Sequence, residues 1–176
     1  MSSMSIIFEH AIQRAAFCYA LCRINQDHID LWCEHNQQTF APFSQLSRKV
    51  ESYLRGELKS LPNLERFHEA FALWRDELIQ DDTLAYQIAE LTCSALYCAA
   101  ESILDPECDD IELLLNNVAE IYRDMESLTD NVPQLREYFT DICQGLQQQL
   151  DDSSRPPLAG DFFRFIDQCD ASLFGL

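Results

Sequence analysis

The chain has 176 residues and a formal net charge of −18, with 30 acidic side chains against 12 basic ones. A hydrophobic fraction of 47% excludes a disordered chain, because disordered segments bury too little apolar surface to fold. The presence of only 4 Gly and 6 Pro argues against an all-β fold or a parallel sheet, which need many turn residues. No apolar run approaches the roughly 18 residues of a membrane span.

Apolar residues recur at helical spacing through almost the whole chain, and no alternating run of β-branched residues predicts a strand. The first half is expected to form four helices, with a break at Ala41-Pro42. Pro62 suits the first turn of the fourth helix, because a proline there forfeits no helix hydrogen bond. The predicted ranges are Ser5–Ile24, Asp27–Gln38, Ser44–Lys59 and Pro62–Ile79.

The second half is expected to form four more helices, and the first of them, Asp81–Leu104, is apolar on nearly every side. A helix of that kind lies in the middle of a fold. Asp109, with Glu112 three residues later, resembles a capping arrangement for the next helix. The remaining expected ranges are Asp109–Leu128, Pro133–Leu150 and Asp161–Phe174. The chain is thus predicted to be all-α, a single domain over residues 1–176 with about eight helices around a central apolar helix.

The eight cysteines mostly occupy positions where a helical pattern places apolar residues. Met1–Glu9 lacks the features of a secretory signal, and disulfide frameworks belong to small secreted domains, so we expect buried thiols in the cytoplasm. Cys18, Cys22 and His28 offer a zinc site as an alternative, without the paired spacing that zinc sites usually show. A reactive thiol at Cys108, in a polar stretch, is a further alternative. Because the usual catalytic and phosphate-binding motifs are missing, we expect no enzyme activity, cofactor or metal.

Two carboxylates, Glu90 and Glu101, interrupt the central apolar helix. If they face the interior of the bundle, they predict a small-ligand site or an enzyme; if they point outward or pair with an arginine, they do not. The final helix carries Phe162, Phe163 and Phe165. These rings either dock the helix onto the core, or form an exposed anchor for a partner. The second alternative predicts a regulatory or structural subunit that associates through its C-terminal helix.

Two short segments resemble the opening of a known family. Residues 15–23 read AAFCYALCR, and residues 30–33 read DLWC. They resemble the YjaG-like family of bacterial proteins, a domain of unknown function, which places an L-C-E-R segment in its first helix and an aromatic segment soon after. The Ala/Cys-rich stretch Ala89–Ile103 also resembles the central helix of that family, although Arg23 follows Cys22 here without the Glu. The resemblance implies an all-helical bacterial cytosolic protein, and it implies no activity and no site residue.

The negative charge is unevenly distributed along the chain. Residues 1–60 carry six basic and six acidic side chains, so residues 61–176 carry the whole net charge of −18. Such a field repels nucleic acid and anionic membranes and attracts basic proteins. We therefore predict a non-enzymatic acidic binding protein that neutralises a basic protein partner, such as an immunity protein or inhibitor of a toxin, or an acidic mimic of DNA. The alternative is that the charge only confers solubility. The predicted partner-binding residues are Asp105, Glu107, Asp109, Asp110, Glu112, Glu120, Asp124 and Glu126.

Overall fold

The computed structural model describes residues 6–175, and over that range the chain forms helices and connecting segments without a strand. This confirms the all-α prediction. In the same range no helix is both long and apolar enough to cross a lipid bilayer. The helices are α1 (Ala11–Ile24), α2 (Gln26–His35), α3 (Ala41–Leu54), α4 (Leu61–Asp76), α5 (Leu84–Leu104), α6 (Ile111–Met125), α7 (Val132–Leu150) and α8 (Gly160–Asp167).

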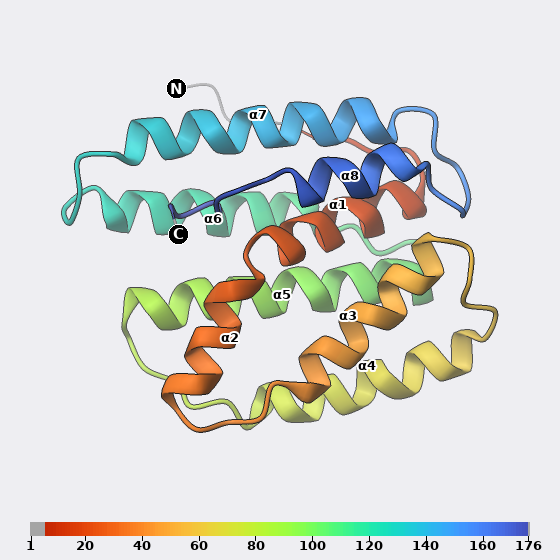
Figure 1. Cartoon of the computed structure of the whole chain (residues 1–176), viewed down its shortest axis with the longest axis horizontal. Helices are drawn as coiled ribbons and strands as arrows, with labels where there is room; N and C mark the ends of the chain where they lie inside the picture. Colours follow the sequence, from red (N-terminus) through yellow and green to blue (C-terminus); the bar gives the residue numbers. More distant parts are fainter. Residues whose placement is uncertain (1–5, 176) are drawn as a thin grey trace.

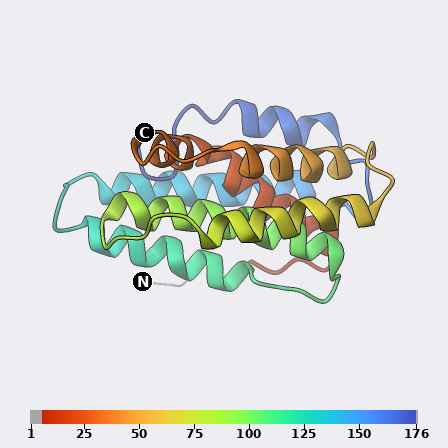
Figure 2. The ribbon, with the colours of Figure 1, turned by 90° about the horizontal axis from the view of Figure 1, so that it is seen from below.

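Helices α1 and α5 pack against each other at the centre of the bundle (Figure 1). Helix α5 contacts α1, α2, α3, α4 and α6, because its apolar residues cover nearly all of its circumference. The predicted central apolar helix is therefore confirmed. In Figure 1, α2, α3 and α4 lie on one side of this pair and α6 and α7 on the other. Figure 2 shows α2, α3 and α8 on one face of the molecule and α6 on the opposite face.

Helix α1 is buried as completely as α5, which its sequence pattern does not predict. Every residue from Ile12 to Cys22 is buried, although two of them, Gln13 and Arg14, are polar. Buried polar groups need hydrogen-bond partners, and Gln13 Nε2 donates to the carbonyl oxygen of Leu150 at 2.7 Å. The Arg14 guanidinium donates to the carbonyl oxygens of Phe8 at 2.9 Å, Cys108 at 3.0 Å and Pro106 at 2.7 Å.

Five predicted helix ends in the first half need correction, and two of them are the ends of α2 and α4, which come three residues earlier than predicted, at His35 and Asp76. Helix α1 begins at Ala11 rather than Ser5, which lies outside the described residues, and the His10 amide donates to Gln13 Oε1 at 2.9 Å. Helix α3 begins at Ala41, because Pro42 occupies its first turn and forms part of the helix rather than a break. It ends at Leu54 rather than Lys59, because Gly56 adopts φ 76°, a left-handed conformation that terminates helices.

The last helix is also shorter than predicted. Helix α8 ends at Asp167, and residues 168–175 turn back to bury Leu173 and Phe174 in the core. Four polar contacts hold this C-terminal segment. Tyr122 Oη donates to the Leu173 carbonyl oxygen at 2.6 Å, and Tyr138 Oη donates to the Ala171 carbonyl oxygen at 2.6 Å. The Leu173 amide donates to Asn25 Oδ1 at 3.0 Å. His28 Nε2 and Ser172 Oγ form a hydrogen bond of 2.7 Å. The C-terminal segment therefore completes the fold around the α1–α2 junction.

The contact between His28 and Ser172 predicts a pH dependence of folding. Burial lowers the pKa of His28 below its ordinary value of 6.5, so the unfolded chain takes up a proton at a higher pH than the folded protein does. The stability that this group contributes is therefore complete above about pH 6.5 and is lost as the pH falls toward the lowered folded pKa. We expect His28→Gln, which can keep a hydrogen bond to Ser172, to reduce this loss in urea unfolding at a series of pH values. Equal slopes for both proteins would assign the pH dependence to other groups.

Candidate functional site

The eight acidic residues predicted as a partner surface fall into two groups at opposite ends of α6. Asp105, Glu107, Asp109 and Asp110 lie on the α5–α6 connection, and Glu112 lies in the first turn of α6. At ~1.5 Å per residue, α6 separates this group from Glu120, Asp124 and Glu126 by roughly 12 Å or more. The structure therefore does not place all eight residues in one cluster. All of them are exposed except Asp110, which is half-buried.

The first group is engaged largely within its own connection. Asp105 Oδ1 accepts from the Glu107 amide at 3.1 Å, and Asp109 Oδ1 accepts from the Ile111 amide at 3.5 Å. The helix begins one residue later than the predicted capping pattern requires, with Asp110 at the N-cap position and no side-chain cap bond. The pattern of Asp109 with Glu112 is thus not a capping box, although the carboxylates still lie beside the positive end of the helix dipole.

Asp110 faces two cysteines. Its Oδ2 atom accepts from Cys108 Sγ at 3.3 Å and from Cys98 Sγ at 3.8 Å. Burial, with the Asp110 carboxylate as the next cause, raises the pKa of the Cys108 thiol to about 11 and that of Cys98 to about 12. Because the thiolate is the nucleophilic form, both groups are weak nucleophiles at neutral pH. This arrangement argues against the reactive-thiol alternative at Cys108.

The remaining cysteine alternatives concern metal binding. All eight cysteines are free thiols, with Cys108 and Cys169 half-buried and the others buried, as predicted for most of them. Cys18 and Cys22 lie in the core, while His28 hydrogen-bonds Ser172. Within residues 6–175 no group of three or more His, Cys, Asp or Glu side chains is placed to hold a metal ion. The packing interpretation of these cysteines is therefore the one that the structure supports.

Two residues of the second acidic group line a groove between α5 and α6. The groove has a volume of about 360 Å³. Glu120 and Asp124 line it from α6, and Glu90 lines it from α5. Tyr86 and Asn117 are among the other lining residues. Glu126 lies outside the groove and pairs with Arg136. The structure thus places Glu90 beside two of the predicted partner-binding residues, Glu120 and Asp124. Glu90 is thirty residues away from Glu120 in the sequence, so no local sequence pattern could predict this.

Glu90 and Glu101, which interrupt the central helix, both have cationic or titratable partners on α4. The Arg75 guanidinium donates to Glu90 and to Ser94 Oγ, the latter at 2.7 Å. His68 Nε2 lies 3.0 Å from Glu101 Oε2. Both carboxylates are half-buried at the α4–α5 seam. Glu90 therefore has the arginine partner that the sequence suggested as one alternative, whereas Glu101 has a histidine in that place.

The groove-facing side of α6 also carries an exposed apolar residue. Leu113, Asn117, Glu120 and Asp124 follow one another at spacings of four, three and four, which places them on one face of the helix. The Leu113 side chain is 57% exposed. This face therefore combines one apolar group with the carboxylates of the groove.

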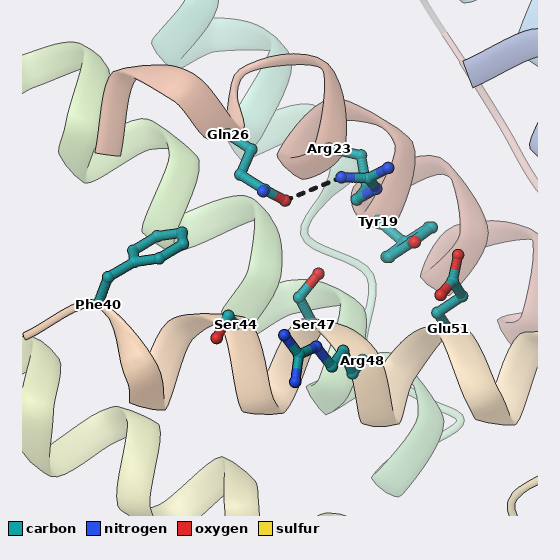
Figure 3. A pocket seen from close by; sticks show the side chains of 8 residues that line it. All are labelled: Tyr19, Arg23, Gln26, Phe40, Ser44, Ser47, Arg48 and Glu51. Carbon is teal, nitrogen blue, oxygen red and sulfur yellow. Dashed lines mark hydrogen bonds between the residues drawn. The ribbon is translucent and has the colours of Figure 1, made fainter. Parts of the chain in front are cut away.

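A second hollow lies between α1 and α3, and the sequence reasoning did not identify it. The α1–α3 pocket has a volume of about 370 Å³ and is lined by Tyr19, Arg23, Gln26, Phe40, Ser44, Ser47, Arg48 and Glu51. Figure 3 shows the first three residues facing the α3 side chains across the gap, with Phe40 at one end. The one clue in the sequence was that residues 1–60 hold half of all the basic side chains and no net charge.

No protein-family model, no curated protein and no solved structure matches this chain. The resemblance to the YjaG-like family therefore stays a prediction. The functional argument rests on the α5–α6 groove and the α1–α3 pocket themselves.

Proposed function

We propose that the protein is a non-enzymatic acidic binding protein, of the immunity-protein or inhibitor type, that receives a basic side chain of its protein partner in the α5–α6 groove. One observation carries the proposal, the convergence of Glu90, Glu120 and Asp124 on one groove. All eight cysteines are free thiols, which fits a reducing cytoplasm.

The charges of the groove are incompletely neutralised. Arg75 pairs with Glu90, but within residues 6–175 no cation pairs with Glu120 or Asp124. Both of these carboxylates are exposed. A guanidinium group binds carboxylates through two parallel hydrogen bonds, which makes an arginine of a partner the best match. The groove accordingly has room and charge for a cationic side chain.

The surroundings of the groove provide the other parts of a protein interface. Leu113 is an exposed apolar residue on the same face of α6, and the Tyr86 ring lines the groove. Interfaces commonly combine an aromatic or apolar centre with a polar rim. The net charge of −18 adds a long-range attraction, which raises association rates more than it raises affinity. A rigid helical scaffold with a steep negative field suits rapid capture of a basic protein.

The proposal predicts a site-specific loss of association rate. The partner is first captured from the native cell lysate at low salt and identified by mass spectrometry, and its association is then measured by surface plasmon resonance. We expect Glu120→Gln with Asp124→Asn to slow association about tenfold at low salt, because two facing charges are removed. The effect should shrink as salt screens the field.

The matched control removes two carboxylates at the same four-residue spacing on another helix. Glu65 and Glu69 are exposed on α4, so Glu65→Gln with Glu69→Gln changes the net charge equally without touching the groove. Association is expected to slow far less in this variant. If both double variants slow association equally, the whole field acts and the groove has no special part. If no basic protein is recovered, the charge serves solubility.

A further inference from the structure

The α1–α3 pocket gathers positive charge in a protein that is otherwise strongly negative. Arg23 and Arg48 line it, against the single carboxylate of Glu51. Arg23 donates to Gln26 Oε1 at 3.0 Å and lies 3.8 Å from Asp167, which is exposed. Arg48 is exposed and has no hydrogen-bond or ion-pair partner within the described residues. Two guanidinium groups on one pocket repel each other unless an anion lies between them.

The four other cations of the neutral segment do not line the pocket. The buried Arg14 guanidinium donates to three carbonyl oxygens. Arg55 pairs with the pocket carboxylate Glu51 at 3.4 Å, and its guanidinium lies 3.8 Å from the centre of the Phe163 ring. Lys49 lies 5.0 Å from the centre of the Phe67 ring, and Lys59 donates to the Gly56 carbonyl oxygen at 3.2 Å. Arg23 and Arg48 are therefore the cations of this segment that face a cavity.

Neutral donors surround the two guanidinium groups. Gln26 uses its Oε1 atom for Arg23, and its amide NH₂ group makes no hydrogen bond within the described residues. Ser47 lies between Ser44 and Arg48 on the pocket side of α3 (Figure 3). Burial, followed by the nearby Glu51 carboxylate, raises the pKa of Tyr19 far above its ordinary value, and the protonated phenol is directed at the Glu51 side chain rather than at the open pocket. The Ser47 hydroxyl, the Gln26 amide and the two guanidinium groups together favour an oxyanion.

One end of the pocket is aromatic. The Phe40 ring stacks on Phe43 with ring centres 5.1 Å apart and closes that end (Figure 3). A volume of about 370 Å³ lies at the lower end of the range for small-molecule sites. A small ligand with an apolar or aromatic body against Phe40 would fill it.

We propose that the α1–α3 pocket binds a small organic oxyanion, a carboxylate or a phosphate monoester, with the anionic group between Arg23 and Arg48 and the body of the ligand against Phe40. This site is independent of the α5–α6 groove, because the two share no lining residue. It takes a small anion, whereas the groove takes a basic protein.

Calorimetric titration of the full-length protein with phenyl phosphate, benzoate and inorganic phosphate at low salt tests the proposal. We expect saturable binding of phenyl phosphate or benzoate, with weaker binding of inorganic phosphate because it has no body to contact Phe40. Tighter binding of phenyl phosphate identifies the phosphate form of the ligand, and tighter binding of benzoate identifies the carboxylate form. Arg48→Gln is expected to weaken binding about tenfold, since a charge-assisted hydrogen bond is lost.

The control is Arg123→Gln, which removes the same charge from an exposed arginine on α6. It should leave binding within about twofold of the wild type, because Arg123 does not line the pocket. Arg48 is exposed and makes no hydrogen bond or ion pair within the described residues, so its variant should unfold like the wild type. Equal weakening in both variants, equal binding of inorganic and phenyl phosphate, or no saturable binding of any probe at millimolar concentration would each overturn the proposal.

Discussion

Replacing Arg14 with methionine is expected to lower the free energy of unfolding by about 3 kcal/mol, because each carbonyl oxygen that loses its partner costs about 1 kcal/mol or more. Methionine keeps much of the length of the side chain, so packing changes little. The three oxygens belong to Phe8, Pro106 and Cys108. For a domain of this size the melting temperature should fall by roughly 10 °C.

The effect should extend to the acidic connection between α5 and α6. Arg14 holds this connection at Pro106 and Cys108, so hydrogen exchange of the amides of residues 105 and 107–110 should accelerate in the Arg14→Met variant. The control is Arg123→Met, since Arg123 is exposed on α6. A loss in Arg14→Met no larger than in the control would mean that water satisfies the three carbonyl oxygens.

Phe162→Ala is expected to destabilise the protein by about 3–5 kcal/mol, the usual cost of deleting a buried aromatic ring. Phe162 is fully buried, and its ring packs edge-on against that of Phe163 with centres 5.1 Å apart. Because α8 contacts both α7 and α1, the cavity would open at the junction of three helices. Chemical unfolding measures the change directly.

Phe165→Ala provides the comparison for Phe162→Ala. Phe165 is only half-buried, at the edge of a hollow between α7 and α8, so its loss should cost about 1–2 kcal/mol. Its ring lies so close over Gly145 that an added Cβ would overlap the ring. If Phe162→Ala unfolds like the wild type but changes self-association, the Phe-rich helix is a partner anchor rather than part of the core.

The sequence pattern was sufficient for the helices but not for their ends. Helical spacing of apolar residues is a local property, so it located each helix and singled out α5 as central. The ends depend on backbone details that periodicity does not register, such as the left-handed Gly56 after α3. The burial of Arg14 was equally hidden, because its three acceptors include two that are more than ninety residues away.

The candidate sites depended on tertiary structure to a larger degree. The sequence indicated Glu120 and Asp124 as part of an acidic surface, but not that Glu90 joins them in a groove. The sequence suggested an arginine partner as one alternative for Glu90 and Glu101, but it did not identify Arg75 and His68 as the partners. Each of these side-chain contacts requires two helices to present particular faces to each other. The crossing angle of two helices is decided by packing along their whole length.

The sequence by itself determined that this protein is an all-helical domain with a central apolar helix, buried thiols and a negative field confined to residues 61–176. These properties follow from composition and from periodicities that a single segment carries. Only the tertiary structure decided that the negative field includes one groove of three carboxylates, and that Arg23 and Arg48 meet on one pocket. The physical reason is that hydrophobic burial selects helices locally, whereas the positions of polar side chains relative to one another are set by the packing of remote helices.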